Sequence, residues 1–257
     1  MSWFTIAIAL VLGLVFGSFL ALAIYRVPAE ESLAHPRPRC PSCSVPVRAA
    51  DTIPVISWLM LRGRCRACGV RISTVYPLTE LASGGLFVAV ALVYEDPWRA
   101  VLLAPFAGLM VALSVIDIRD RRIPNRLVYP AFVIAAAVII AGDLAGGGLD
   151  ALDAGIGLFA YGLGLMIIAL ISPKGMGMGD VKLAGLIGLV LGSIGLDLVA
   201  VAAGMGILLG GAGAIVALLS GAGRKSAIPF GPFLASGAVI AVFVGRQIAD
   251  AYLNLLT

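Results

Sequence analysis

The sequence predicts an all-α polytopic membrane protein with about eight transmembrane helices and one small cytoplasmic loop domain. Hydrophobic residues make up 61% of the 257 residues, and the mean hydropathy is +1.07. Charged residues make up only 12%, whereas a soluble domain carries about 25%. The apolar residues form long windows, and a single sizeable polar segment, residues 26–76, holds all four cysteines. This composition excludes a soluble protein, and we expect the lipid bilayer to surround most of the chain.

The helices are expected where windows of roughly 17–25 apolar residues occur. The first window has no basic segment before it, so we expect a retained helix rather than a cleaved signal peptide. The sixth window is short, and its boundary with the seventh is weakly marked. The chain then divides into a first helix (1–25), the cytoplasmic loop domain (26–76) and a transmembrane domain (77–257). The eight windows are 3–25, 77–94, 98–116, 127–142, 152–172, 183–196, 198–220 and 228–247.

The basic residues set the orientation. All Lys and Arg residues except Arg99 and Arg246 lie on the side of the membrane that carries segment 26–76. By the positive-inside rule this side is cytoplasmic, and both termini lie outside. The pI near 9.0 therefore reflects topology, and we expect no nucleic-acid partner.

Segment 26–76 contains two pairs of cysteines, Cys40-x-x-Cys43 and Cys65-x-x-Cys68. Two such pairs at this distance can place four thiolates tetrahedrally around one Zn²⁺, which leaves no open position for catalysis. A reducing cytoplasm disfavours disulfides, and an iron–sulfur or redox centre is the alternative. The segment has too few apolar residues for its own core, so a structural zinc ion is expected to order it.

The catalytic groups that the sequence offers are carboxylates. His35 is the only histidine and lies in a Pro-rich loop, so no role is assigned to it. Unless His35 itself serves, histidine-based nucleophilic mechanisms are excluded. The sequence also lacks a Gly-x-Ser-x-Gly, HExxH or phosphate-binding motif.

The most unusual stretch is Gly175-Met176-Gly177-Met178-Gly179-Asp180-Val181-Lys182, at the mouth of an apolar window. A charge at membrane depth is costly and marks a candidate functional residue. Alternating glycines allow a backbone or a substrate strand to approach the carboxylate closely. Asp180 is therefore the first candidate for the active site.

Asp117 is its expected partner, because it ends the third apolar window on the cytoplasmic side, whereas Asp120 lies among arginines and is expected to be solvated. The topology places Asp117 and Asp180 at the same depth on different helices. Two such carboxylates cannot easily both ionise and can share one proton. The ionised group would take a proton from a water that attacks a peptide carbonyl, and the protonated group would polarise that carbonyl and later protonate the amine. This is the chemistry of an aspartic protease.

Two other stretches leave alternatives open. Glu80, near the start of the second window, is either an acid favoured by the helix dipole or a functional residue. Ile228-Pro229-Phe230-Gly231-Pro232 opens the last window and is either a kinked helix start or irregular backbone that lines a cavity.

Taken together, the sequence resembles the type IV prepilin peptidases, also called prepilin leader peptidase/N-methyltransferases, of the Gly-x-Gly-Asp class of intramembrane aspartyl proteases. The resemblance runs nearly end to end and is highly specific as an ordered set. Besides the two cysteine pairs, it rests on Gly17-Ser18-Phe19-Leu20, Arg26-Val27-Pro28, Ile53-Pro54-x-x-Ser57, Gly63-Arg64-Cys65-Arg66, Arg71-Ile72-Ser73, Tyr76-Pro77-Leu78-x-Glu80, Ile116-Asp117, Ile123-Pro124-Asn125, Gly175 to Leu183 and Ile228 to Pro232.

The resemblance implies a catalytic pair, Asp117 and Asp180. It implies precursors of type IV pilins or pseudopilins as substrates, which carry a short basic leader ending in glycine and then a hydrophobic helix. Cleavage after that glycine would occur at the cytoplasmic face of a bacterial inner membrane. Many members then methylate the new N-terminus with S-adenosylmethionine, an activity associated with the cytoplasmic loop. The implied supporting residues are Gly177, Gly179, Lys182, Pro229 and Gly231 around the aspartates, and Gly63, Arg64 and Glu80 for methylation.

Two departures from the family pattern bear on these expectations. Ala21 stands where the family usually has Asn, which weakens the case for methyltransferase activity. Asn125 stands where an acidic residue is common, which points to Asp117 as the catalytic acid. Two other functions compete with the peptidase. A proton- or cation-coupled transporter would use Asp117, Asp180 and Lys182 as a relay and should show mid-membrane acids and a repeat between halves. A non-catalytic zinc-stapled scaffold would tolerate replacement of both aspartates.

Overall fold

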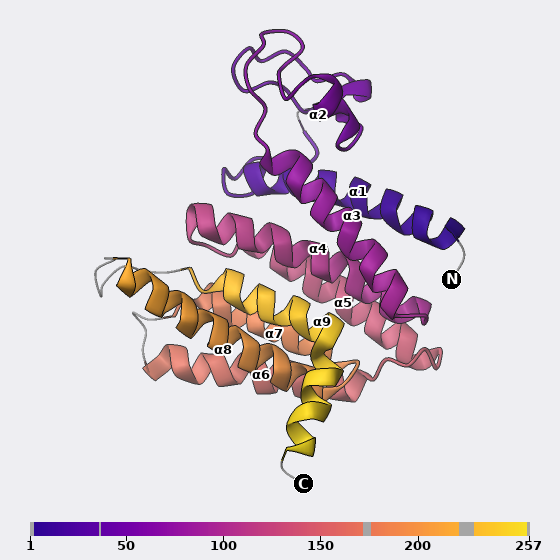
Figure 1. Ribbon diagram of the computed structural model, residues 1–257, viewed down its shortest axis with the longest axis vertical. Coiled ribbons are helices and arrows are strands. Elements are labelled where there is room, and N and C mark those ends of the chain that lie inside the picture. The colour runs from indigo at the N-terminus through magenta and orange to yellow at the C-terminus, as the bar shows by residue number, and fades with distance from the viewer. Residues whose placement is uncertain (1–2, 36, 172–175, 221–228, 256–257) are drawn as a thin grey trace.

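A computed structural model describes residues 3–35, 37–171, 176–220 and 229–255. Within these ranges the chain is helical and forms no strand, only two isolated β-bridges. The all-α fold class is thereby confirmed (Figure 1). The elements are α1 (Trp3–Arg26), η1 (Ala49–Thr52), α2 (Ile56–Met60), α3 (Val75–Val93), α4 (Pro97–Asp120), α5 (Asn125–Leu144), α6 (Ala151–Ile171), α7 (Met178–Gly192), α8 (Leu196–Leu219) and α9 (Gly231–Asn254).

Seven of the helices in the described residues are long and apolar enough to cross a membrane, namely α1, α3, α4, α5, α6, α8 and α9. The helix at the sixth expected window is not among these candidate spans. It corresponds to α7, which has 15 residues and is therefore about 22 Å long, shorter than a hydrocarbon core of about 30 Å. Every residue of α7 from Leu183 to Gly192 is buried. This helix packs against α4, α5, α6, α8 and α9, so its apolar residues from Leu183 onward face protein.

The close approach of α6 and α7 depends on glycine. A Cβ atom on Gly188 would overlap the carbonyl oxygen of Gly157, and a Cβ on Gly157 would overlap that of Gly188. A Cβ on Gly192 would lie 2.6 Å from the carbonyl oxygen of Asp153. In lipid, small residues of this kind let helix backbones pack directly together. The packing fixes the position of α7, and with it the first turn that carries Asp180.

We predict that Gly188→Ala destabilises the protein by at least about 1–3 kcal/mol, because the added methyl group forces two backbones apart. Gly164→Ala is the matched control, since Gly164 lies on α6 and a Cβ there would contact nothing within 4 Å. Thermal unfolding in detergent checks the prediction. Equal unfolding temperatures for the two variants would contradict it.

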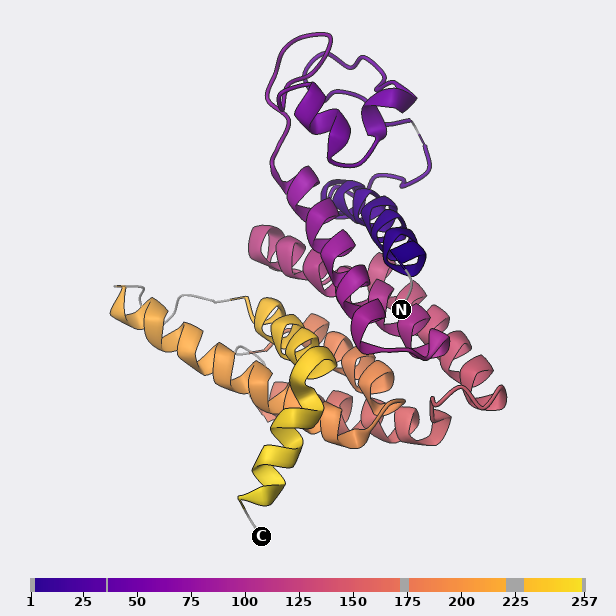
Figure 2. The same cartoon turned by 45° about the vertical axis from the view of Figure 1, so that its right-hand side comes forward.

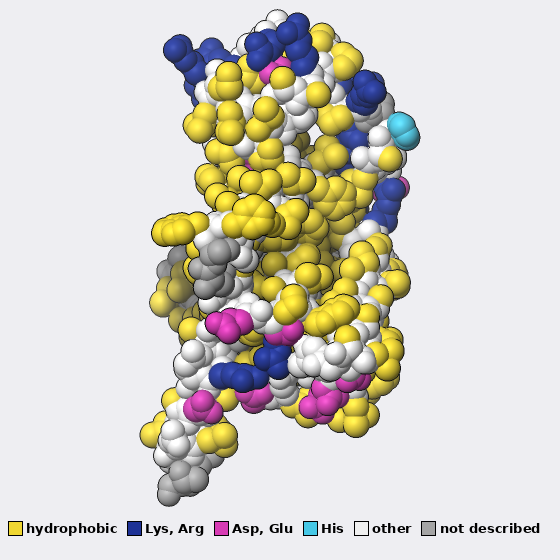
Figure 3. Space-filling view, turned by 90° about the vertical axis from the view of Figure 1, so that its right-hand side faces the viewer, with side chains coloured by type: hydrophobic (Ala, Val, Ile, Leu, Met, Phe, Trp, Pro, Cys, Tyr) yellow, Lys and Arg dark blue, Asp and Glu magenta, His cyan; other side chains and the backbone are white. Residues whose placement is uncertain are grey.

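The helix α4 is the centre of the bundle. It packs against α1, α3, α5, α7 and α9, and most of its residues from Leu102 to Asp117 are buried. In Figures 1 and 2 the loop with α2 lies at one end of the molecule beside α1 and α3, and α6 and α8 lie toward the opposite end. Figure 3 shows a face of the molecule that is mostly apolar across its middle, with most Lys and Arg in the upper part and most Asp and Glu in the lower part, where a smaller group of Lys and Arg lies among them.

Candidate active site and metal site

Asp117 lies in the last turn of α4, with only 5% of its surface exposed. Its Oδ2 accepts a hydrogen bond of 3.0 Å from the backbone N–H of Gly231, the first residue of α9. The N-terminus of a helix favours a negative charge. The contact requires glycine, because a Cβ at position 231 would lie 2.7 Å from Oδ2. Helix α9 therefore begins directly on the Asp117 carboxylate.

Asp180 lies in the first turn of α7 and is partly exposed. Its Oδ2 accepts a hydrogen bond of 3.3 Å from the N–H of Gly177, the residue that caps this helix. The backbone N–H of Asp180 donates in return to the carbonyl oxygen of Gly177 at 3.0 Å. Each aspartate thus accepts a hydrogen bond from the N–H of a glycine at the start of a helix. For Asp117 of α4 this glycine belongs to α9, and for Asp180 it is the cap of its own helix, α7.

The structure brings the two aspartates to one place. Ile123, in the connection between α4 and α5, lies next to a neighbour of each aspartate. A Cβ on Gly179, the residue before Asp180, would lie 3.1 Å from Ile123 Cβ. A Cβ on Gly231, whose N–H binds Asp117, would lie 3.2 Å from Ile123 Cδ1. Sequence analysis did not single out Ile123. Its membership of the Ile123-Pro124-Asn125 motif was the only available signal.

The expected supporting residues differ in what they contact. Lys182 donates from its ammonium group to Oδ1 of Asn125 at 3.0 Å, and this group also lies 5.4 Å from the centre of the Tyr129 ring. It therefore joins α7 to the start of α5. Pro229 is half-buried two residues before α9 begins. Gly175 and Ile228 lie outside the described residues.

We predict that Gly231→Ala lowers any activity of this site by about 100-fold, because displacing a reacting group by about 1 Å can have that effect. Gly177→Ala is the control, since a Cβ there would lie 3.6 Å from Asp180 Oδ2, an ordinary contact. The rate of substrate cleavage measured for both variants checks this. Full activity of Gly231→Ala would show that the position of the Asp117 carboxylate is not important.

The four cysteines converge on one point. Their sulfur atoms all lie within 4.8 Å of one another, and the Sγ atoms of Cys40 and Cys68 are 3.8 Å apart. Tetrahedral coordination with Zn–S bonds of about 2.3 Å separates sulfurs by about 3.8 Å. The cluster therefore fits a four-thiolate metal site, as the spacing predicted.

The two cysteine pairs form two knuckles with the same backbone hydrogen bonds. In each, the N–H of the first cysteine donates to the carbonyl five residues later, and the N–H four residues later donates back to that cysteine. The donor–acceptor distances are 3.0 and 2.9 Å around Cys40 and 2.8 and 2.9 Å around Cys65. The fourth residue after each first cysteine has positive φ, 59° at Ser44 and 72° at Gly69. Gly69 was visible in the sequence as the residue for this turn, whereas Ser44 was not.

The backbone N–H groups of Cys43 and Ser42 lower the pKa of Cys40 to about 6, so this thiol is largely ionised at neutral pH. The N–H of Val70 favours the Cys68 thiolate, but desolvation and the other three sulfurs raise its pKa to about 12. The neighbouring sulfurs thus lower the pKa of Cys40 but raise that of Cys68, and a bound cation favours the thiolate form of a coordinating cysteine. These charges favour a divalent metal in the cluster.

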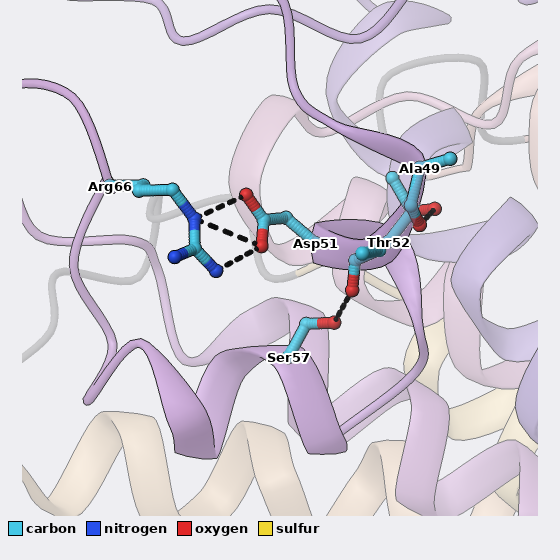
Figure 4. A network of polar contacts seen from close by, with 6 residues as sticks. Ala49, Asp51, Thr52, Ser57 and Arg66 are labelled. Atoms are coloured by element: carbon cyan, nitrogen blue, oxygen red, sulfur yellow. Dashed lines mark hydrogen bonds and ion pairs between the residues drawn. The ribbon is translucent and has the colours of Figure 1, made fainter.

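An ion pair braces the second knuckle (Figure 4). Arg66 Nη2 lies 2.6 Å from Asp51 Oδ1, and its Nε lies 2.9 Å from Oδ2. The hydrogen bonds from Arg66 lower the pKa of Asp51. Nearby, the Ser57 hydroxyl donates to the carbonyl oxygen of Ala50 at 2.8 Å. Sequence analysis missed Asp51, because nothing in its neighbourhood marks a partner 15 residues away.

Glu80 connects the membrane helices to the loop. It is buried, with 6% of its surface exposed, and its Oε2 accepts a 2.7 Å hydrogen bond from the N–H of Val55. Because α3 begins at Val75, Glu80 lies beyond the first turn, and a role as a first-turn acid is wrong. Val55 has φ of 62°, a conformation that is rare for a β-branched residue. The carboxylate therefore holds a strained turn of the loop.

The other two residues that the resemblance linked to methylation lie within the loop. Gly63 is buried with φ of 65°, and a Cβ there would lie 2.7 Å from the Trp58 ring. Arg64 is exposed and forms a β-bridge with Arg71. Glu80 is joined to this loop by its hydrogen bond with Val55.

Comparisons with known proteins cover almost the whole chain. Residues 11–94 match the bacterial peptidase A24 N-terminal domain, and residues 104–220 match the type IV leader peptidase family. The chain is similar to a Bacillus subtilis protein, with 34% identity over 253 residues, 97% of this chain and 98% of the relative. A relative from Aeromonas hydrophila is 33% identical, with 99% and 96% covered, and one from Stutzerimonas stutzeri is 35% identical, with 96% and 93% covered. All three are called prepilin leader peptidase/N-methyltransferase. No solved structure matches.

Proposed function

The chain belongs to the type IV leader peptidase family, and from this premise we propose that it is an intramembrane aspartic endopeptidase that removes the leader of type IV prepilins or pseudopilins. The observation that carries the proposal is the pairing of Asp117 with Asp180, each held by a backbone N–H at a helix start. None of the similar proteins named above is a transporter, and their names give the transporter hypothesis no support.

In the proposed mechanism the two carboxylates share one proton. The ionised one takes a proton from a water molecule as the water oxygen attacks the carbonyl carbon of the scissile bond. The other carboxyl donates a hydrogen bond to the carbonyl oxygen and then gives its proton to the departing amine. The hydrogen bonds from Gly231 and Gly177 hold the two carboxylates in place. Neither histidine nor a catalytic metal takes part.

We place the cut after the leader glycine, at the cytoplasmic face of the bacterial inner membrane. The distribution of Lys and Arg supports this orientation, with both termini outside and the aspartates facing the cytoplasm. Asp117 lies three residues before the end of α4 and Asp180 two residues after the start of α7, the depth at which a soluble leader meets an apolar segment. The substrate would therefore approach through the membrane, with its leader in the cytoplasm.

The cysteine cluster is proposed to hold a structural zinc ion in the loop domain (26–76), between the first helix (1–25) and the transmembrane peptidase domain (77–257). When bound, zinc would cross-link the two knuckles and supply no catalytic chemistry. We further propose that the loop serves a second activity, N-methylation of the new N-terminus with S-adenosylmethionine, through Gly63, Arg64 and Glu80. The bond from Val55 to Glu80 supports this, because it joins the loop to the membrane helices.

The test is cleavage of a purified model prepilin by the purified protein in detergent, with the product identified by mass spectrometry. The expected product begins at the residue after the leader glycine, and with S-adenosylmethionine it is heavier by one methyl group. A prepilin with the leader glycine replaced is the control and should remain uncut. No cleavage, or cleavage elsewhere, would contradict the peptidase proposal. An unmodified N-terminus would restrict the activity to proteolysis.

A further inference from the structure

An apolar cavity of about 530 Å³ opens between α3, α4 and α9. We call it the α3–α9 groove. It is lined by residues 110, 111 and 114 of α4 as its floor, and by residues 81, 82, 85 and 86 of α3 and 235, 236, 239 and 240 of α9 as its walls. Both walls pack against α4 (Figures 1 and 2). The volume is within the range of ligand sites, about 300–1,000 Å³. Because all three helices are candidate membrane spans, the groove lies at membrane depth.

The groove leads to Asp117. Ser114 of the floor precedes Asp117 by three residues, so the two side chains lie on the same face of α4, one turn apart. The α9 wall belongs to the helix that begins at Gly231, whose N–H binds the Asp117 carboxylate. At 1.5 Å per residue each wall extends over about 8 Å of helix. A molecule in the groove would thus lie about one helical turn from Asp117.

The groove is open at Gly85. A Cβ on Gly85 would contact nothing within 4 Å, whereas one on the adjacent Gly84 would lie 3.1 Å from Leu14 of α1. Gly84 is therefore used for packing inside the bundle, and Gly85 leaves free space at the groove. The opposite wall carries the small residues Ala235 and Ser236. Small residues let helix backbones approach closely in lipid.

We propose that the α3–α9 groove binds the apolar transmembrane helix of the substrate and so places the peptide bond before that helix beside Asp117. The inference rests on the proposed peptidase function and names the subsite that this function requires. Continuity with the Asp117 carboxylate favours a substrate helix over a lipid chain or a second copy of the protein. Only a substrate that is cut at the membrane face needs its apolar segment in register with the aspartates.

The first test compares Gly85→Leu with Gly164→Leu. A Cβ at either position contacts nothing within 4 Å, so both variants should fold, but only the first places a side chain in the groove. For full-length prepilin we expect kcat/KM to fall at least about tenfold in Gly85→Leu, because the scissile bond is displaced, and to stay unchanged in Gly164→Leu. Equal values for the two variants would overturn the proposal. If the wild type fails to cut prepilin, the peptidase proposal fails instead.

The second test identifies the occupant directly. A photoreactive benzoylphenylalanine is placed at position 85 or 164 in the Asp180→Asn protein, and full-length prepilin is added in lipid vesicles. We expect an adduct with the apolar segment of prepilin from position 85 and none from position 164. Adducts at position 85 with lipid alone, or with a second copy of the protein, would overturn the inference.

Discussion

Replacing either Asp117 or Asp180 with Asn is expected to reduce prepilin cleavage by about 1,000-fold or more. General acid–base catalysis contributes about 10²–10⁴-fold, and in the proposed mechanism a single pair carries both the deprotonation of water and the protonation of the amine. Asn keeps the size of Asp and an oxygen that can accept from Gly231 or Gly177, but it cannot take or give the shared proton. The double variant should be no slower than either single variant, because the two groups act as a unit.

The matched control is Asp120→Asn. Asp120 lies one turn after Asp117 on the same helix and is exposed, so its replacement should leave cleavage unchanged. Metal content and unfolding temperature establish that all variants fold. Normal cleavage by either Asp117→Asn or Asp180→Asn would refute the two-aspartate mechanism. Cleavage by neither the variants nor the wild type would leave a non-catalytic scaffold or a transporter, which a flux assay in proteoliposomes would separate.

The positions of the eight apolar segments could be predicted from the sequence, because buried or lipid-facing helices need continuous apolar runs, and each run corresponds to a helix. Whether lipid or other helices surround each apolar segment could not be predicted. The window at 183–196 looks like a short span, but α7 begins at Met178 and is enclosed by other helices. Hydropathy does not distinguish burial in lipid from burial in protein. The contact of Gly157 with Gly188 that decides this is between residues 31 positions apart.

The same limit applies to the candidate site. The positive-inside rule predicted one depth for Asp117 and Asp180, and in the structure Gly179, next to Asp180, and Gly231, next to the Asp117 carboxylate, both face Ile123. Their hydrogen-bond donors did not follow from the sequence, because the N–H of Gly231 reaches Asp117 only once α9 packs on α4. For Glu80 the sequence suggested a local role, whereas the structure shows a distant partner. Its local position suggested a helix-dipole effect, and its partner is the distant N–H of Val55.

Removing one cysteine is expected to have the largest effect on the structure of the loop. We predict that the purified protein contains one zinc ion per chain and that Cys40→Ser contains almost none. Apparent binding free energies of structural zinc sites are about 10–16 kcal/mol at neutral pH. The Arg66–Asp51 ion pair adds to the order of the loop, but its Arg66 side chain is half exposed to solvent, so its contribution is about 1 kcal/mol. Loss of the metal should therefore unfold the loop while the membrane helices stay packed.

Metal analysis and limited trypsin digestion measure this effect. In Cys40→Ser, trypsin should cut the loop at arginines such as Arg62 and Arg71, which resist in the wild type, and the helical circular dichroism should change little. Ser42→Ala, inside the same knuckle but without a ligand atom, is the control. Because the chain has no other cysteines, a thiol reagent should label four sulfurs once a chelator has removed the metal. Acidification should also release zinc, since the ligands bind as thiolates. Iron in place of zinc, or trypsin resistance in Cys40→Ser, would contradict a structural zinc site and favour a redox centre or a loop that is ordered without metal.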